Sequence, residues 1–260
     1  MNFTYGDIDI NAVIAIAKQA GDAIMDVYSR NFSVEVKDDK SPLTEADRKS
    51  NEVILDGLKQ LTPGIPFISE ETKAVAYEER RNWKRFWLID PLDGTREFIK
   101  RNGEFTVNIA LVEEGVPRLG VVYAPALNQT YFGAEGVGSY KVEGTNFVKL
   151  HAKEHYNTLK KVVVVASRSH LTDETLQFVE RLKQQGKEVD FLSSGSSLKF
   201  CLVAEGKADV YPRFGPTMEW DSAAAHAVVL YAGKGVYEIT GGKPLVYNKE
   251  SLLNPFFIVE

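Results

Sequence analysis

The most informative stretch of this 260-residue chain is Asp90-Pro91-Leu92-Asp93-Gly94-Thr95, which follows the strand-like run 86–89. Proline fixes φ and glycine frees the backbone, so this turn can direct Asp90, Asp93 and the Leu92 carbonyl towards one point. All three are hard oxygen donors of the kind that Mg²⁺ prefers. A short helix can begin at Gly94-Thr95 with its N–H groups facing an anion. The stretch therefore predicts a metal site beside an anion site.

Two further acidic positions extend this candidate cluster. Glu70 stands in Ser69-Glu70-Glu71, after a predicted strand, and Asp221 follows Trp220 at the start of a predicted helix. Four carboxylates gathered in a cleft would repel one another and raise their pKa values unless a cation neutralised them. A divalent cation bound there could also neutralise an anion held at the start of the short helix at Gly94-Thr95. Taken alone, the acids could be loop and cap residues, and Glu71 could support the cluster or face solvent.

Hydrophobic periodicity predicts an α+β chain without alternating βαβ units. Residues 10–27 have the spacing of a long helix, and a second helix is predicted from Thr44, as a plausible N-cap, to Leu61. Turn signals separate three β-rich runs that indicate an antiparallel meander. A second half begins near residue 160. We expect one compact unit with an N-terminal half, 1–155, and a C-terminal half, 156–260. Strands are predicted at 65–68, 85–89, 105–113, 118–124, 130–134, 162–165, 189–192, 208–211, 236–237 and 256–258, and helices at 173–185, 196–204 and 220–231.

Composition narrows the class of protein. The hydrophobic content is 44% and the formal net charge is −5, so no basic field favours nucleic acid. The single cysteine, Cys201, forbids an internal disulfide and is expected to be a buried thiol. No stretch has the length and apolarity of a membrane span. We expect a soluble, cytoplasmic protein with a sizeable core.

The acidic motifs, taken in this order, resemble those of the inositol monophosphatase superfamily. The resemblance covers nearly the whole chain, and it also includes the segments at 41–47, 167–170, 195–201 and 204–214. It implies a layered αβαβα sandwich and a lithium-sensitive phosphomonoesterase with roughly two or three Mg²⁺ per active site. The implied metal ligands are Glu70, Asp90, Leu92, Asp93 and Asp221. Homodimer formation and peripheral attachment at the inner face of the cell membrane stay open.

The resemblance also assigns a water-positioning group. It implies that Thr95 is hydrogen-bonded to Asp47 and that Thr95 and Glu70 together position the attacking water. Asp47 has a second interpretation, because Thr44 and Asp47 have the spacing of a helix capping box with Asp in place of Glu. The implied catalytic residues are therefore Asp47, Glu70 and Thr95.

The segments of the second half are most similar to the bisphosphate nucleotidases of this superfamily. This implies removal of the 3′ phosphate of adenosine 3′,5′-bisphosphate to leave AMP, an activity linked to sulfate assimilation. Lys199 and Arg213 are candidates for holding the phosphate that is not cleaved, and Arg is the better bidentate ligand. The implied substrate contacts are Glu70, Asp93, Gly94, Thr95, His170, Ser196, Lys199, Arg213 and Asp221.

Two alternatives keep the same sequence features. An inositol or sugar-phosphate phosphatase would share the metal cluster, so only the segments of the second half separate it from a nucleotidase. A regulatory protein that only senses nucleotide would have no need for the water-activating pair. The intact set of acids together with Thr95 argues against this second alternative.

Overall fold

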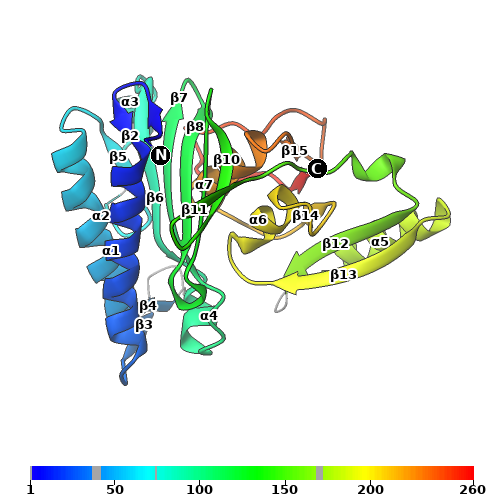
Figure 1. The fold of residues 1–260 in the computed structure, drawn as a ribbon, viewed down its shortest axis with the longest axis horizontal. Helices are drawn as coiled ribbons and strands as arrows, with labels where there is room; N and C mark the ends of the chain where they lie inside the picture. Colours follow the sequence, from blue (N-terminus) through cyan, green and yellow to red (C-terminus); the bar gives the residue numbers. More distant parts are fainter. Residues whose placement is uncertain (1, 37–41, 74, 168–171) are drawn as a thin grey trace.

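A computed structural model describes residues 2–36, 42–73, 75–167 and 172–260. Figure 1 shows helices and sheets stacked in alternating layers: α1 and α2, then a large sheet, then α6 and α7, then smaller sheets together with α5. This is the layered α+β sandwich that the motifs implied. It places the ends of the large sheet beside the helices of the third layer.

The first layer consists of two amphipathic helices, α1 (Ile10–Tyr28) and α2 (Glu45–Leu61), which pack on each other and on the large sheet. Asp9 caps α1 by accepting from the Asn11 N–H at 2.9 Å. Thr44 caps α2, and the Asp47 side chain accepts in return from the Thr44 N–H at 2.7 Å. Both predicted helices are confirmed within a residue of their expected ends, because a capping group and an apolar stripe agree at each.

The second layer is a seven-stranded sheet with the order β11-β10-β9-β8-β7-β6-β5. All neighbours are antiparallel except β5 and β6, which are parallel. The predicted meander is confirmed, while β10 and β11 extend it beyond the prediction. The strands are β5 (Phe67–Ser69), β6 (Arg85–Asp93), β7 (Thr106–Glu113), β8 (Val116–Ala124), β9 (Gln129–Ala134), β10 (Gly138–Glu143) and β11 (Asn146–Lys149).

The third layer holds α6 (Leu198–Ala204) and α7 (Glu219–Leu230), and α7 lies against the middle of the large sheet. Two glycines of the sheet make this close approach possible. A Cβ atom at Gly120 would lie 2.1 Å from the Ala224 carbonyl oxygen, and one at Gly133 would lie 2.6 Å from that of Ala227. The depth of α7 in the molecule is therefore fixed by backbone contact with the sheet.

The last layers contain two small sheets and α5 (Asp173–Gln184). One sheet has the order β14-β16-β15, and the other pairs β12 with β13 in parallel. The strands are β12 (Lys161–Ser167), β13 (Glu188–Ser194), β14 (Tyr211–Arg213), β15 (Val236–Glu238) and β16 (Phe257–Val259). The third strand predicted for this half begins later than expected, because 208–210 make only an isolated bridge to β12, between Val164 and Val210.

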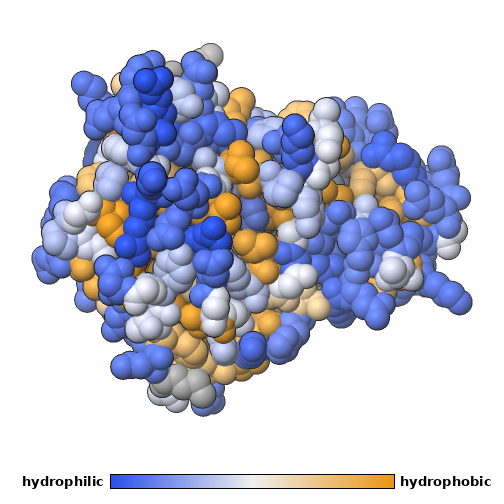
Figure 2. All heavy atoms as spheres, turned by 90° about the horizontal axis from the view of Figure 1, so that it is seen from above, coloured by the Kyte–Doolittle hydropathy of each residue, from blue (hydrophilic) through white to orange (hydrophobic). Residues whose placement is uncertain are grey.

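Short elements complete the chain, and one of them, α4, also lines the main cavity described below. They are β1 (Thr4–Tyr5), β2 (Ile8–Asp9), β3 (Val34–Val36), β4 (Pro42–Thr44), α3 (Tyr77–Arg80), α4 (Thr95–Ile99) and the 3₁₀ turns Pro125–Leu127 and Tyr156–Thr158. Hydrophilic residues cover most of the face seen in Figure 2. Among the described residues, no helix is both long and apolar enough to cross a membrane. Cys201 is buried, as expected.

Candidate active site

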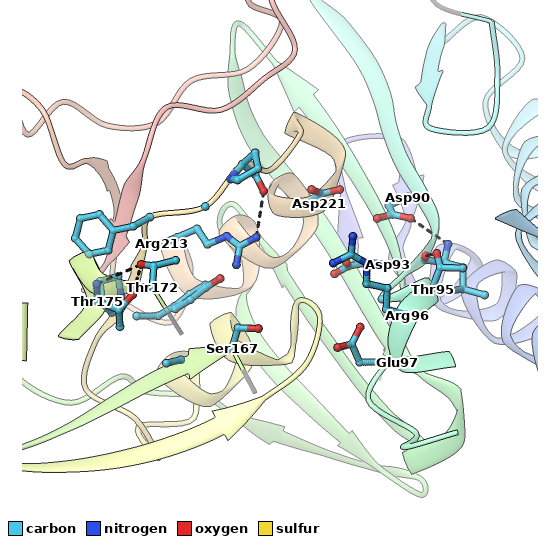
Figure 3. Close-up of a pocket in the computed structure, with 18 of the residues that line it drawn as sticks. Asp90, Asp93, Thr95, Arg96, Glu97, Ser167, Thr172, Thr175, Arg213 and Asp221 are labelled. Carbon is cyan, nitrogen blue, oxygen red and sulfur yellow. Dashed lines mark hydrogen bonds between the residues drawn. The ribbon is translucent and has the colours of Figure 1, made fainter. Parts of the chain in front are cut away.

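A cavity of about 500 Å³ opens where the end of β6 meets the start of α7 and strand β14. Figure 3 shows acidic side chains at one end, Thr172 and Thr175 at the other, and Arg213 between them. Both charged and uncharged groups therefore face the same space. The lining residues are Glu70, Asp90, Leu92, Asp93, Gly94, Thr95, Arg96, Glu97, Ala166, Ser167, Thr172, Thr175, Tyr211, Pro212, Arg213, Phe214, Gly215, Pro216 and Asp221.

The end of β6 is bent so that its acids reach the cavity. The pairing of β6 with β7 shifts register between Asp90 and Asp93, which is the signature of a bulge. The Asp90 side chain accepts from the Leu92 N–H at 3.0 Å, and the Ser50 hydroxyl donates to the Pro91 carbonyl at 2.7 Å. The proline turn is therefore held from both sides, and it belongs to the strand itself.

Three carboxylates meet at the acidic end. One oxygen from each of Glu70, Asp90 and Asp221 lies within 4.8 Å of the others. They come from three separate places: the end of β5, the strand β6 and the first turn of α7. The Asp221 side chain also accepts from the Met218 N–H at 2.8 Å, which fixes its direction. An all-oxygen set of this kind suits a hard divalent cation.

The electrostatics of these three carboxylates favour a positive partner. Burial raises the pKa of Asp90 well above its usual range, and Glu70, Asp93 and Asp221 raise it further. Burial also raises the pKa of Asp221, reinforced by Asp93 and Glu70. Desolvation and like charge disfavour the ionised form in both cases, and a bound cation would reverse both effects. The residues present therefore fit a metal centre.

Asp93 lines the same cavity but is engaged differently. Its Oδ2 atom accepts from the Ser196 hydroxyl at 2.6 Å, from the Ser197 hydroxyl at 3.0 Å and from the Asn108 amide at 3.5 Å. Ser197 also donates to the Asp221 carbonyl at 2.9 Å. Hydroxyl donors that converge on one carboxylate oxygen fix the orientation of the Asp93 side chain.

Thr95 lies at the start of α4, beside the bulge. Its hydroxyl is 3.3 Å from Asp47 Oδ1 and 3.3 Å from the Leu92 carbonyl oxygen, both of which can accept. The other oxygen of Asp47 accepts from the Thr44 N–H and hydroxyl, each at 2.7 Å. Asp47 therefore makes two kinds of contact at once: one oxygen caps α2, and the other lies within hydrogen-bonding distance of the Thr95 hydroxyl.

Lys199 is buried, and so it does not lie on a solvent-exposed face of α6. It is 6% exposed, its Nζ donates to the Ser196 carbonyl at 2.5 Å, and it lies 5.5 Å from the Tyr211 ring centroid. Burial lowers the pKa of Lys199 to about 8, although the negative charge of Asp93 opposes the shift. Lys199 lines a smaller cavity of about 150 Å³ that shares Asp93 and Arg213 with the main one.

Arg213 projects from the end of β14 into the main cavity, as Figure 3 shows. Its Nη2 donates to the Pro216 carbonyl at 3.1 Å, and this bond orients one end of the guanidinium.

Two further predicted substrate contacts are Gly94 and His170. Gly94 has φ = +92°, and a Cβ there would lie 3.3 Å from the Ser196 Cβ, so this turn needs a glycine. His170 lies outside the described residues.

Sequence reasoning missed the groups that hold Asp93. Thr106 and Asn108 stand two positions apart in the buried strand β7, so they point to one face, and Thr106 contacts the Ser196 hydroxyl at 2.5 Å. Two polar residues at that spacing inside an apolar strand were a usable signal. Ser197, within the segment that carried the resemblance, makes contacts as close as those of Ser196.

An acidic cavity between the layers of an α+β sandwich, lined by carboxylates that fit a divalent cation, is the arrangement of a metal-dependent phosphatase. The chain belongs to the inositol monophosphatase family, whose model matches residues 8–255. It is 50% identical over 253 residues to the 3′(2′),5′-bisphosphate nucleotidase CysQ of Salmonella typhimurium, covering 96% of this chain and 98% of that protein.

Further relatives and solved structures point to the same family. The CysQ protein of Escherichia coli K12 is 49% identical, with the same coverage of both chains. The crystal structure of CysQ from Bacteroides thetaiotaomicron, a bacterial member of the inositol monophosphatase family, superposes with a TM-score of 0.82 at 47% identity, covering 96% of this chain and 95% of that one. An IMPase of Thermotoga maritima has a TM-score of 0.76 at 28% identity, covering 96% and 91%.

Proposed function

We propose that this protein is a 3′(2′),5′-bisphosphate nucleotidase, which hydrolyses the 3′ phosphate of adenosine 3′,5′-bisphosphate to give AMP and phosphate. The observation that carries the proposal is the convergence of Glu70, Asp90 and Asp221 in a cavity that also receives Arg213. The nucleotidases that are about half identical over nearly the whole chain support the choice of substrate.

The residues that would hold metal are Glu70, Asp90, the Leu92 carbonyl, Asp93 and Asp221. We propose Mg²⁺ as the ion, since each donor is a hard oxygen atom. Bound Mg²⁺ supplies neutralising charge for the phosphate and a bound water of lowered pKa. The protein keeps the ligands aligned through the bulge of β6 and through the hydroxyls that fix Asp93.

Thr95 and Glu70 are proposed to position the attacking water. The Thr95 hydroxyl lies between two acceptors, Asp47 Oδ1 and the Leu92 carbonyl. Because the other oxygen of Asp47 is held by the cap of α2, the acceptor atom is fixed in place. Thr95 can then accept a hydrogen bond from water while its own proton points to Asp47. Gly94 and Thr95 provide the N–H groups that face the phosphate.

The part of the cavity around Arg213 is proposed to bind the rest of the nucleotide. Arg213 would hold the 5′ phosphate, and Asp221 would also contact the ribose. Ser196 and His170 are further proposed contacts. Lys199 contributes positive charge in the adjoining smaller cavity, where its ammonium group donates to the Ser196 carbonyl. By the same resemblance we propose lithium inhibition, a cytoplasmic location and a role in sulfate assimilation.

One comparison tests the function directly. Phosphate release should be measured from adenosine 3′,5′-bisphosphate and from inositol 1-phosphate, each with and without Mg²⁺. We expect fast, Mg²⁺-dependent release from the nucleotide alone. Preferential release from inositol 1-phosphate would identify an inositol phosphatase, and full turnover after exhaustive chelation would exclude the metal mechanism.

Mg²⁺ should raise the thermal stability of the protein, and less so in acid. Binding to the folded state alone stabilises it by roughly 2.7 kcal/mol at 100 times the Kd. Burial and neighbouring carboxylates raise the pKa values of Asp90 and Asp221, so protons compete with the ion as pH falls. Thermal midpoints with and without Mg²⁺, at about pH 8 and about pH 6, check this. An equal or larger rise at the lower pH would contradict it.

Arg213→Ala should lower kcat/KM for adenosine 3′,5′-bisphosphate by roughly tenfold to a hundredfold. A charge-assisted hydrogen bond contributes about 1.5–3 kcal/mol, and tenfold in affinity is about 1.4 kcal/mol. Hydrolysis of 3′-AMP, which has no 5′ phosphate, is the internal control and should barely change. Arg213→Lys should rescue only part of the loss, because it lacks the planar fork. Equal losses on both substrates would mean that Arg213 supports the fold or the metal site.

A further inference from the structure

Helix α7 carries a buried polar stripe that the proposed chemistry does not use. Glu219, Ser222 and His226 follow one another at three- and four-residue spacing, so they share one face of the helix. They are 0%, 1% and 4% exposed. All three contact a single segment, residues 247–254, called the strap below. The polar stripe therefore forms hydrogen bonds with one segment, while alanines of α7 pack against the large sheet.

Glu219 makes the strongest contacts with the strap. Its Oε2 accepts from the Asn248 N–H at 2.6 Å, and its Oε1 accepts from the Lys249 N–H at 3.0 Å and from Lys249 Nζ at 2.6 Å. Asn248 has φ = +69°, a left-handed conformation that turns its N–H towards the carboxylate. Both oxygens are thus satisfied by a fixed backbone, and Lys249 balances the buried charge.

The other two residues of the stripe, Ser222 and His226, also form hydrogen bonds with the strap. His226 Nδ1 lies 2.9 Å from the Tyr247 hydroxyl, which in turn donates to Ser222 at 3.3 Å. The Asn254 amide donates to Ser222 Oγ at 2.9 Å and to the Met218 carbonyl at 2.8 Å. The polar side chains of α7 and the backbone before it are therefore joined to the same segment.

Arg80 forms hydrogen bonds with the strap from the side opposite to α7. It is 3% exposed and ends α3, far from α7 in the sequence. Its guanidinium donates to Asn248 Oδ1 at 2.9 Å, to the Lys249 carbonyl at 2.6 Å and to the Glu250 carbonyl at 2.7 Å. The strap is thus held between Arg80 and Glu219, and the position of α7 is tied to the N-terminal half.

We propose that Glu219 is a positioning residue that fixes Asp221 against the repulsion of Glu70 and Asp90. Asp221 lies two residues further along, in the first turn of α7, where any shift of the helix start would move its carboxylate. Repulsion among carboxylate oxygens within 4.8 Å of one another would displace that turn, and the hydrogen bonds to the strap would hold it in place. This inference rests on the proposed metal site, but it concerns how the ligands are held together.

Glu219→Gln is the test variant. Its amide nitrogen would face a donor at one of the two oxygen positions, so at least one bond to the strap is lost together with the charge. Groups that orient ligands typically change metal affinity by roughly 10–100-fold, so we expect the Kd for Mn²⁺, measured by electron paramagnetic resonance, to rise about tenfold. At saturating metal, kcat should stay within about threefold of the unmodified protein, because no contact with the reacting atoms is removed.

Glu205→Gln is the matched control. Glu205 is also a carboxylate paired with lysines, 2.6 Å from Lys207 and 3.4 Å from Lys141. Its side chain is 8% exposed, and it lies outside the main cavity. It should lose thermal stability and keep normal Mn²⁺ affinity. If Glu219→Gln also lost stability but bound Mn²⁺ as tightly as the unmodified protein, Glu219 would have only a structural role.

Arg80→Lys tests the same route from the other side of the strap. It keeps the charge but loses the fork, so Mn²⁺ affinity should fall in the same direction. Since both residues act through the strap, the double variant should lose less than the product of the two single effects. Normal Mn²⁺ binding by Arg80→Lys would overturn the inference even if Glu219→Gln failed to fold. No Mn²⁺ binding by the unmodified protein would overturn the proposed metal chemistry itself.

Discussion

Replacing Asp90 with asparagine is expected to abolish turnover and, at the same time, to raise the thermal midpoint of the metal-free protein. Asp90 is 1% exposed and is one of the three carboxylates that converge within 4.8 Å. Metal-borne charge contributes several kcal/mol to such a reaction, and each 1.36 kcal/mol is tenfold in rate, so a loss of about 10³-fold or more is expected. Phosphate release at saturating Mg²⁺ measures it.

The stability gain follows from the pKa of Asp90. Burial and the charges of Glu70, Asp93 and Asp221 raise this pKa above its usual value of 3.8. A carboxyl whose pKa is higher in the folded state destabilises the fold at neutral pH and loses that cost as pH falls. Asparagine copies the protonated form, and its oxygen can still accept from the Leu92 N–H. Each kcal/mol gained raises the midpoint by roughly 2–4 °C at this chain length.

Asp209→Asn is the control for this result. Asp209 is 2% exposed, and it accepts from the Val163 N–H at 2.7 Å, outside the main cavity. Its replacement should leave turnover within about twofold and should not raise stability, because the charge of Asp209 interacts favourably with that of Lys234. Near-normal turnover of Asp90→Asn would remove Asp90 from the chemistry. A lower midpoint without metal would show that the acids do not destabilise the metal-free fold.

Local patterns predicted those parts of the fold that are determined locally. The capping box of Thr44 and Asp47 spans three residues, and the start of α2 was correct. Strand β10 was missed because a buried lysine interrupts its apolar pattern, and β11 was missed because it is mostly exposed. Lys141 is 9% exposed and is tolerated because Glu205, distant in sequence, lies 3.4 Å away. Likewise, periodicity predicted that β5 and β6 exist, but not that they pair in parallel.

The candidate site divides in the same way. The turn at 90–95 could be inferred because its residues are neighbours in the chain. The hydroxyls that fix Asp93 come from Ser196 and Ser197, about a hundred positions away, so no local pattern indicates them. Burial of Lys199 was equally hidden, because it depends on Tyr211 and on how α6 packs. The strap that holds Glu219 is also a purely tertiary feature.

Thr95→Ala is the second change with a large expected effect: kcat should fall by roughly 10²-fold or more, by analogy with other lost proton-positioning groups. The Thr95 hydroxyl lies 3.3 Å from Asp47 Oδ1, and alanine removes this link without touching any of the converging carboxylates. Metal binding should therefore survive, and the rise in thermal midpoint caused by Mg²⁺ should stay unchanged. Turnover and this midpoint shift are measured on the same preparation.

Thr95→Ser tests whether the hydroxyl group, and not the methyl group, is needed for activity. Serine keeps the oxygen and loses only a methyl group, so most of the activity should return. Asp47 is the less clean position for this test, because its other oxygen accepts from the Thr44 N–H and hydroxyl and caps α2. A loss in Asp47→Asn would mix lost catalysis with lost helix capping, which alone costs about 1 kcal/mol. If Thr95→Ala kept its full kcat, the pair of Thr95 and Asp47 would be structural, and the water would have to be positioned by Glu70 without them.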